Sequence, residues 1–485
     1  MAMGALSVVT GCRRVDAPRR GVRGGVRRRS SVSARLDSTP QEAGAPPRWR
    51  NRRREAAKTP DELYYEQMAW SDVPVVPVER RVRRTPGQIL EEEEAESCPL
   101  DLHAERASDF EAAMIVVGTT VGGGFLAMPY FAAPAGFVPA VLMSVGAWAA
   151  LAASGLLVSE ALLHTWARSS GRAVSLLSVT AEYLGPAWGY VAAVSFFVMM
   201  NCTLVSQLAK CGALAHFFSG GVVSHVIGAT ATAAAVGAIA FSRAASKVNA
   251  VATVGIFASF ALICVFGMAN LAPGKLAFMD FAAVLPALPG IVQLYAYGEC
   301  LPTVVDMLRG DRARIRRVIL LGTTLPLAMY TCWLAVALAQ TGSWAGTADV
   351  AQVMLESGGV LGVATASVAV TASISTLIGG YLALSRFCAD ALKKKTVTHS
   401  RSVAALTLVP SLLFALRGPE VYFTALEFSG AVVVVILWGL LPPLLANSLW
   451  RRQGTLSGLR RGLVLAWTAV ASVALCCGVR SVVLA

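Results

Sequence analysis

Residues 115–129 read IVVGTTVGGGFLAMP and place four glycines and a proline within one apolar stretch. Each glycine inside a helix costs roughly 1 kcal/mol relative to alanine, so this pattern disfavours a continuous helix. Backbone groups freed by a break at membrane depth must line a cavity or contact protein. We therefore predict a discontinuous helix whose free N–H groups near Gly122, Gly123 and Gly124 point toward an anion such as a carboxylate. The alternative is a small-residue packing face, because Gly118 and Gly122 have the GxxxG spacing.

A second interrupted stretch lies at residues 285–302, which read LPALPGIVQLYAYGECLP. Gly298 and Pro302 predict a break midway, with Glu299 inside it. A carboxylate within a membrane is a functional candidate by default, and we interpret Glu299 as a group that takes up and releases a coupling proton. A structural strut, in which Glu299 pairs with Lys210 or another cation, is the alternative. Two interrupted helices at the first and sixth positions indicate inverted five-helix repeats with a site between them.

The whole chain has the composition of an all-α polytopic membrane protein. Of its 485 residues, 55% are hydrophobic and 15% are charged, whereas a soluble domain carries about a quarter charged residues. This composition excludes a soluble enzyme and a disordered scaffold. Stretches of roughly 20 apolar residues, enough to cross about 30 Å of hydrocarbon, recur along the chain. We predict eleven helices, at residues 112–135, 137–164, 187–218, 222–241, 248–271, 282–306, 317–340, 360–391, 402–416, 424–447 and 462–484. The ninth is short enough to be re-entrant.

Basic residues alternate between the predicted loops. The loops on the side of the N-terminal tail hold 17 lysines and arginines, whereas the opposite side holds 3. The positive-inside rule therefore places the tail on the cytosol-like side, which is the stroma in a plastid. Topology accounts for the net charge of +13, so we infer no nucleic-acid partner.

The N-terminal region differs from the rest. Residues 1–34 are rich in arginine and serine, poor in acids and without the apolar core of a secretory signal, which is typical of an organellar transit peptide. Pro18, Gly21 and Gly24 disfavour a long amphipathic helix and so favour a plastid over a mitochondrion. An Arg-rich cytosolic tail is the alternative. We expect residues 35–111 to form a disordered tail on the stromal or cytosolic side, and residues 112–485 to form the transmembrane domain.

Two other predicted spans carry polar side chains. In the third, Thr203, Ser206, Gln207 and Lys210 follow the helical spacing of one face, which we expect to point into the bundle. The eighth contains hydroxyls at residues 371, 373, 375 and 376, which contact either substrate and cation or only their own helical turn. The ten cysteines and five histidines show no metal-ligand spacing. We predict no metal, no cofactor and no enzymatic activity.

The stretch at residues 118–129 resembles the first-helix signature of the aromatic amino acid permeases, which are tyrosine- and tryptophan-specific transporters of the amino acid/polyamine/organocation superfamily. Residues 285–317 are similar to their sixth helix and the following basic loop, and residues 369–392 to their eighth helix. The resemblance covers roughly residues 112–450. It implies a leucine-transporter-type inverted repeat of eleven helices, with helices 1 and 6 broken. Bacterial members carry an aromatic-His-Gly step where this chain has Tyr297, Gly298 and Glu299.

The resemblance implies a secondary active symporter of tyrosine or tryptophan, coupled to protons, with sodium as the alternative ion. Together with the breaks it points to these substrate-binding residues: Gly118, Thr119, Gly122, Gly123, Gly124, Tyr295, Tyr297, Gly298 and Ser373. Glu299 and Thr376 are the predicted ion-coupling residues. The Arg-rich presequence is similar to that of plastid-targeted members, which predicts the chloroplast inner envelope membrane, with a mitochondrial or plasma membrane as alternatives. A same-fold transporter of another neutral amino acid, or a non-transporting sensor or scaffold, remains open.

Overall fold

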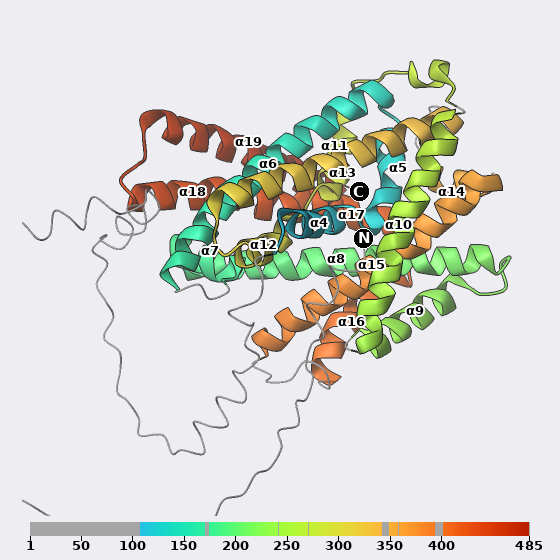
Figure 1. The fold of residues 1–485 in the computed structure, drawn as a ribbon, viewed down its shortest axis with the longest axis horizontal. Helices are drawn as coiled ribbons and strands as arrows, with labels where there is room; N and C mark the ends of the chain where they lie inside the picture. The colour runs from blue at the N-terminus through green and yellow to red at the C-terminus, as the bar shows by residue number, and fades with distance from the viewer. Residues whose placement is uncertain are drawn as a thin grey trace, which may run out of the picture. The chain divides into compact units, whose positions relative to one another are not determined.

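The computed structural model describes residues 107–169, 174–240, 242–269, 271–341, 349–356, 358–392 and 401–484. The predicted transit peptide and nearly all of the predicted tail lie outside these ranges. Every regular element within them is a helix (Figure 1). The predicted all-α class is therefore confirmed for the described part of the chain.

Each of the eleven predicted spans contains a helix or a broken helix. In chain order these are α4–η2–α5 (Asp109–Thr120, Gly123–Ala127, Met128–Ala132), α6 (Phe137–Arg168), α8 (Pro186–Phe218), α9 (His225–Ile239), α10 (Arg243–Ala269), α11–η4–α12 (Val284–Leu294, Gly298–Cys300, Leu301–Met307), α13 (Arg312–Thr341), α15 (Gly359–Ala391), α16 (Arg401–Ala415), α17–η5–α18 (Val421–Phe428, Ser429–Leu440, Leu441–Arg452) and α19 (Gly458–Leu484). Among the described residues, seven helices are long and apolar enough to cross a membrane, and the bent pair α4 and α5 makes an eighth. The helices α9 and α16 are shorter, at 15 residues each.

Three short helices in the connections were not predicted: α7 (Leu176–Leu184), η3 (Pro273–Leu276) and α14 (Val350–Glu356). The first span also begins earlier than predicted. Ser108 caps α4 by accepting a hydrogen bond from the N–H of Glu111 at 3.1 Å, and the Glu111 carboxylate accepts one from the N–H of Ser108 at 2.9 Å. This capping box fixes the start of α4 at Asp109, three residues before the predicted start.

Ion pairs join the helix ends that the charge pattern places on the side of the tail. Glu160, near the end of α6, pairs with Arg312 and Arg316 at the start of α13, at 2.7 Å each. Asp109, at the start of α4, pairs with Arg314 of α13 at 2.5 Å. These contacts put the start of the first span, the end of the second and the start of the seventh on one face, as the predicted alternation requires.

Contacts on the opposite face follow the same alternation. The N–H of Asp280, before α11, donates to the carbonyl of Ala135, after α5, at 2.9 Å. Lys210, in the second half of α8, pairs with Asp349, next to α14, at 2.6 Å. One span too many or too few would separate these partners by the thickness of the membrane, so the contacts support the predicted alternation of the first seven spans.

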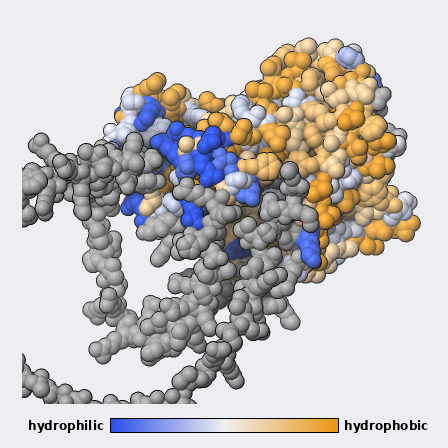
Figure 2. Space-filling view, in the orientation of Figure 1, coloured by the Kyte–Doolittle hydropathy of each residue, from blue (hydrophilic) through white to orange (hydrophobic). Residues whose placement is uncertain are grey.

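The helix α8 runs through the interior of the bundle and contacts α9, α15, α16 and α17, while α6 and α13 lie side by side (Figure 1). Much of the face seen in Figure 2 is hydrophobic, and hydrophilic side chains gather toward the side where α7 and α12 lie in Figure 1. An apolar exterior of this kind suits contact with lipid. The described part of the chain is thus a multi-pass membrane bundle.

Candidate functional site

The first break lies between α4 and α5, whose axes are bent by 46°. The helix α4 ends at Thr120, and Gly122 is extended, with φ −102° and ψ −160°. The N–H of Gly123 donates to Oγ1 of Thr376 on α15 at 2.8 Å, and its carbonyl accepts from the hydroxyl of Tyr422 on α17 at 2.7 Å. The N–H groups of Gly122 and Gly124 have no acceptor among the described residues. The break therefore presents two unpaired donors.

Close packing explains why three of these positions are glycine. A Cβ at Gly122 would lie 2.7 Å from Oγ1 of Thr376, and one at Gly123 would overlap the side-chain amide of Gln207. A Cβ at Gly124 would lie 2.9 Å from a methyl carbon of Leu294. A Cβ at Gly118, in contrast, would meet nothing within 4 Å. The GxxxG packing alternative is therefore not supported at Gly118.

The second break lies between α11 and α12. The helix α11 ends at Leu294, and helical structure resumes at Gly298 with the short helix η4. Tyr330 of α13 connects the two breaks, because its hydroxyl shares its one proton between the carbonyl of Thr120, at 3.0 Å, and that of Leu294, at 3.2 Å. Each carbonyl belongs to the last residue of its helix, where no N–H group of the same helix can donate to it. One side chain thus holds together the points at which both spans are interrupted.

A cavity of about 400 Å³ lies between the two breaks. Seven of the predicted site residues line it: Gly118, Thr119, Gly122, Gly123, Gly124, Glu299 and Thr376. Thr203 and Gln207, from the predicted polar face of the third span, line it too. The structure therefore brings the two breaks, the third span and the eighth span together around one space.

Glu299 faces this cavity without a cation. Its Oε2 atom is buried and has no hydrogen-bond partner, and no ion pair involves it within the described ranges. Lys210 pairs with Asp349 instead. The predicted alternative of a Glu299–Lys210 strut is therefore wrong.

The other four predicted residues lie outside the cavity. Tyr297 points toward α6, where its hydroxyl donates to the carbonyl of Leu151 at 3.2 Å. A Cβ at Gly298 would overlap the ring of Trp438, which covers it. Tyr295 is buried against the ring of Tyr330, with ring centroids 5.1 Å apart. Ser373 is buried as well.

The hydroxyls of the eighth span make three kinds of contact. Thr371 bonds back to the carbonyl of Ser367 at 2.6 Å, as the structural alternative predicts. Ser375 donates to the side-chain oxygen of Asn249 on α10 at 2.8 Å. Thr376 accepts from Gly123 and lines the cavity. The last two hydroxyls therefore connect α15 to other spans, and Ser367 does the same by accepting a hydrogen bond from Ser259 of α10 at 2.7 Å.

Comparison with known proteins agrees with this arrangement. The model of the tryptophan/tyrosine permease family matches residues 105–460. The chain belongs to this family. Tyrosine-specific transport system 2 of Haemophilus influenzae is 26% identical over 350 residues, which cover 66% of this permease and 83% of the relative. The tryptophan-specific transport protein of the same bacterium is 24% identical and covers 69% and 86% of the two chains.

A solved structure shows the fold. The crystal structure of MhsT in complex with L-phenylalanine aligns with a TM-score of 0.52 and 12% identity, covering 77% of this permease and 98% of that chain. This likeness confirms the predicted leucine-transporter-type fold.

Sequence reasoning missed several residues that line the cavity of this permease. Gln293 of α11, Asn249 of α10 and Tyr330 of α13 all face it. Gln293 and Tyr330 are isolated polar residues in apolar stretches, whereas the polar face that Asn249 forms with Thr253, four residues on in the same helix, was not recognised. The one signal available was that a polar side chain inside a membrane span requires a partner.

Proposed function

We propose that this permease is a secondary active transporter of aromatic amino acids, tyrosine or tryptophan. The observation that carries the proposal is a cavity with complementary unpaired groups for a zwitterion. Within the part of the chain that the structure describes, the N–H groups of Gly122 and Gly124 are free donors, and the buried oxygens Oε1 of Gln207, Oε1 of Gln293 and Oε2 of Glu299 are free acceptors. The carboxylate of a bound amino acid would accept hydrogen bonds from the two N–H groups. The ammonium group of the same molecule would donate hydrogen bonds to the oxygens.

The size and lining of the cavity suit an amino acid with a large side chain. Its volume of about 400 Å³ lies within the usual range of roughly 300–1,000 Å³ for small-molecule sites. Met114, Ile115, Met200 and Leu426 supply apolar walls, and Tyr330 supplies an aromatic one. An aromatic ring offset against Tyr330 would gain about 0.5–1.5 kcal/mol beyond its burial.

Proton coupling through Glu299 is part of the proposal. It is supported by the position of Glu299 in the second break, its unpaired Oε2 and the lack of a cationic partner in the described part of the chain. Sodium coupling is the second candidate, because Oγ1 of Thr376 is an oxygen of the kind that binds sodium, lines the cavity and lies 2.8 Å from the N of Gly123 in the first break. The two candidates differ in which gradient drives accumulation.

The location and direction of transport are also proposed. The Arg-rich, acid-poor composition of residues 1–34 supports import into a plastid and insertion in its inner envelope membrane. Aromatic amino acids made inside such a compartment could leave through this permease, because the direction of a symporter follows its gradients. A fusion of residues 1–34 to a fluorescent protein tests the address, since a cytosolic signal would contradict it.

Uptake by purified protein in liposomes tests the function. Radiolabelled tyrosine, tryptophan and phenylalanine should accumulate under an imposed pH gradient, and unlabelled alanine or leucine should compete poorly. Strong competition by alanine would indicate a transporter of small neutral amino acids. If the protein binds tyrosine but carries none under a pH or sodium gradient, the sensor or scaffold alternative replaces transport. Deletion of residues 35–108 should leave uptake intact if the transmembrane domain alone carries the activity.

A further inference from the structure

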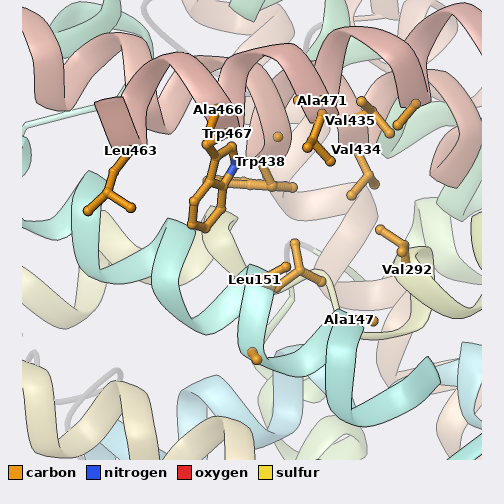
Figure 3. A pocket seen from close by; sticks show the side chains of 15 residues that line it. Ala147, Leu151, Val292, Val434, Val435, Trp438, Leu463, Ala466, Trp467 and Ala471 are labelled. Carbon is orange, nitrogen blue, oxygen red and sulfur yellow. The ribbon is translucent and has the colours of Figure 1, made fainter. Parts of the chain in front are cut away.

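A second pocket, of about 590 Å³, lies on the other side of the sixth span (Figure 3). Its walls come from α6, α11, η5 and α19, and apart from the ring nitrogens of two tryptophans they consist of apolar side chains. Figure 3 shows Trp438 of η5 and Trp467 of α19 in the space above Leu151 of α6. No acid, amide or hydroxyl lines it. Its ligand must therefore be apolar where it enters.

The surroundings of the pocket point to the bilayer as the source of that ligand. Both α6 and α19 are apolar enough to cross the membrane, and α19 has the most exposed surface of the seven long helices. Its most apolar stretch is 17% buried, against 28–67% in the other six. The pocket thus lies against a helix that is largely in contact with lipid.

The start of α19 carries positive charges, which add a second requirement for the ligand: a polar, anionic group. Arg460 precedes Leu463 of the pocket by three residues, so the two share a face of α19. Its guanidinium lies 5.0 Å from the ring of Trp450 and donates to the carbonyl of Thr455 at 2.9 Å, which fixes it at the turn between α18 and α19. Arg461 is exposed beside it. Two cations therefore stand at one end of an apolar pocket.

The length of the pocket matches a lipid chain that starts at these arginines. Its lining on α19 runs from Leu463 to Ala474, which is about 17 Å along a helix axis. Half of the hydrocarbon thickness of a bilayer is about 15 Å. We propose that one acyl chain of an anionic phospholipid occupies this pocket, with its phosphate at Arg460 and Arg461.

This site shares a wall with the second break. The ring of Trp438 borders the pocket on one side and covers Gly298 on the other. Leu151, another wall residue, accepts the hydrogen bond of Tyr297, and Ser154 donates to the carbonyl of Trp438 at 2.5 Å. A bound chain holds Trp438 against Gly298 and so affects how the sixth span opens. This regulatory consequence rests on the proposed transport function, whereas the binding site does not.

The experiment measures lipid binding by the full-length protein in detergent. Phosphatidylglycerol or phosphatidylcholine brominated on one chain is titrated in, and quenching of tryptophan fluorescence is recorded. We expect phosphatidylglycerol to bind at least tenfold more tightly than phosphatidylcholine. Arg460→Gln with Arg461→Gln should weaken phosphatidylglycerol binding about thirtyfold, as expected for two cations near the headgroups. Arg480→Gln, at the far end of α19, is the matched control and should leave binding unchanged.

A second variant tests the pocket itself. Ala466→Phe fills the space from an exposed position on α19, whereas Ala469→Phe adds the same ring outside the lining. Only Ala466→Phe should abolish saturable quenching. Equal affinity for the two lipids, or quenching that survives Ala466→Phe, would overturn the proposal and leave ordinary lipid contact.

Uptake in liposomes with and without phosphatidylglycerol then measures regulation. Activity should depend on phosphatidylglycerol in the parent and lose that dependence in Ala466→Phe. Equal activity in both lipids would overturn the regulatory step. If no variant and no lipid gives uptake although saturable binding persists, the proposed transport function fails and the lipid site stands.

Discussion

At the scale of single residues, Glu299 holds a carboxylate oxygen that is buried, unpaired and next to the cavity. If this group carries the coupling proton, Glu299→Gln imitates its protonated form permanently. Exchange of internal for external substrate should then continue, whereas accumulation driven by a pH gradient should disappear. With the membrane potential clamped, the parent should reach at most about tenfold accumulation per pH unit at one proton per substrate.

Counterflow and gradient-driven uptake, measured on the same liposomes, check this prediction. Glu427→Gln is the control, because Glu427 lies in a span but does not line the cavity. Loss of exchange as well as accumulation in Glu299→Gln would indicate that the carboxylate binds the substrate ammonium group. Unchanged accumulation would make it a structural residue.

Gly123 is a residue where the backbone itself must stay uncovered. A Cβ there would overlap the amide of Gln207, whereas a Cβ at Gly118 would enter open space. We expect Gly123→Ala to reduce uptake of tyrosine at least tenfold, and Gly118→Ala to retain most of it, with both proteins present in the membrane. Equal activities of the two alanine variants would contradict a steric role.

At the scale of elements, Tyr330 of α13 ties the ends of α4 and α11 together through one hydroxyl. Tyr330→Phe keeps the ring and removes both hydrogen bonds. A net contribution of about 0.5–1.5 kcal/mol per hydrogen bond predicts a lower Tm, and displaced breaks predict a higher KM for tyrosine.

Tyr297→Phe removes a hydroxyl that bonds outside the cavity, to Leu151. It should lower Tm without changing KM, and a raised KM in this variant alone would place the aromatic wall at Tyr297.

The sequence predicted the helical elements well because length and hydropathy determine a membrane span. The connecting helices α7 and α14 were missed, since nine and seven residues are too few for a periodic signal. The glycine cluster at residues 122–124 located the first break, and Gly298 with Pro302 located the second, because the cost of these residue types in a helix is a local property. The contacts across the cavity were less predictable: Tyr297 and Glu299 are two residues apart, yet one points to α6 and the other lines the cavity. The direction in which a side chain points from a non-helical turn depends on tertiary packing, which composition does not encode.

At the scale of the whole molecule, ion pairs connect elements on both faces of the bundle. Lys210 and Asp349 join α8 to the α14 region on one face, with side chains 6% and 15% exposed. Lys210 also lies 5.2 Å from the ring of Tyr422, whose hydroxyl bonds to Gly123 in the first break. On the other face, Asp109 of α4 pairs with Arg314 of α13. A transporter that opens alternately to its two sides must break contacts of this kind one face at a time.

The last prediction therefore concerns which face each pair closes. A reporter cysteine, Thr119→Cys, places a thiol on the cavity wall, and its labelling by a membrane-impermeant reagent reports access from each side. The double variant Lys210→Met with Asp349→Leu removes both partners. Removing only one would leave a buried charge unpaired and would lower the stability by about 3–5 kcal/mol. This change should raise labelling several-fold from the face opposite the tail and lower it from the tail side. Asp109→Asn should have the reverse effect, because it releases α4 from Arg314 and Arg317. Cysteines already in the chain are replaced by serine or alanine in every variant, so that the signal comes from residue 119 alone. Labelling that rises equally from both sides would mean that the pairs stabilise the bundle as a whole, and the two faces would not be gated by them.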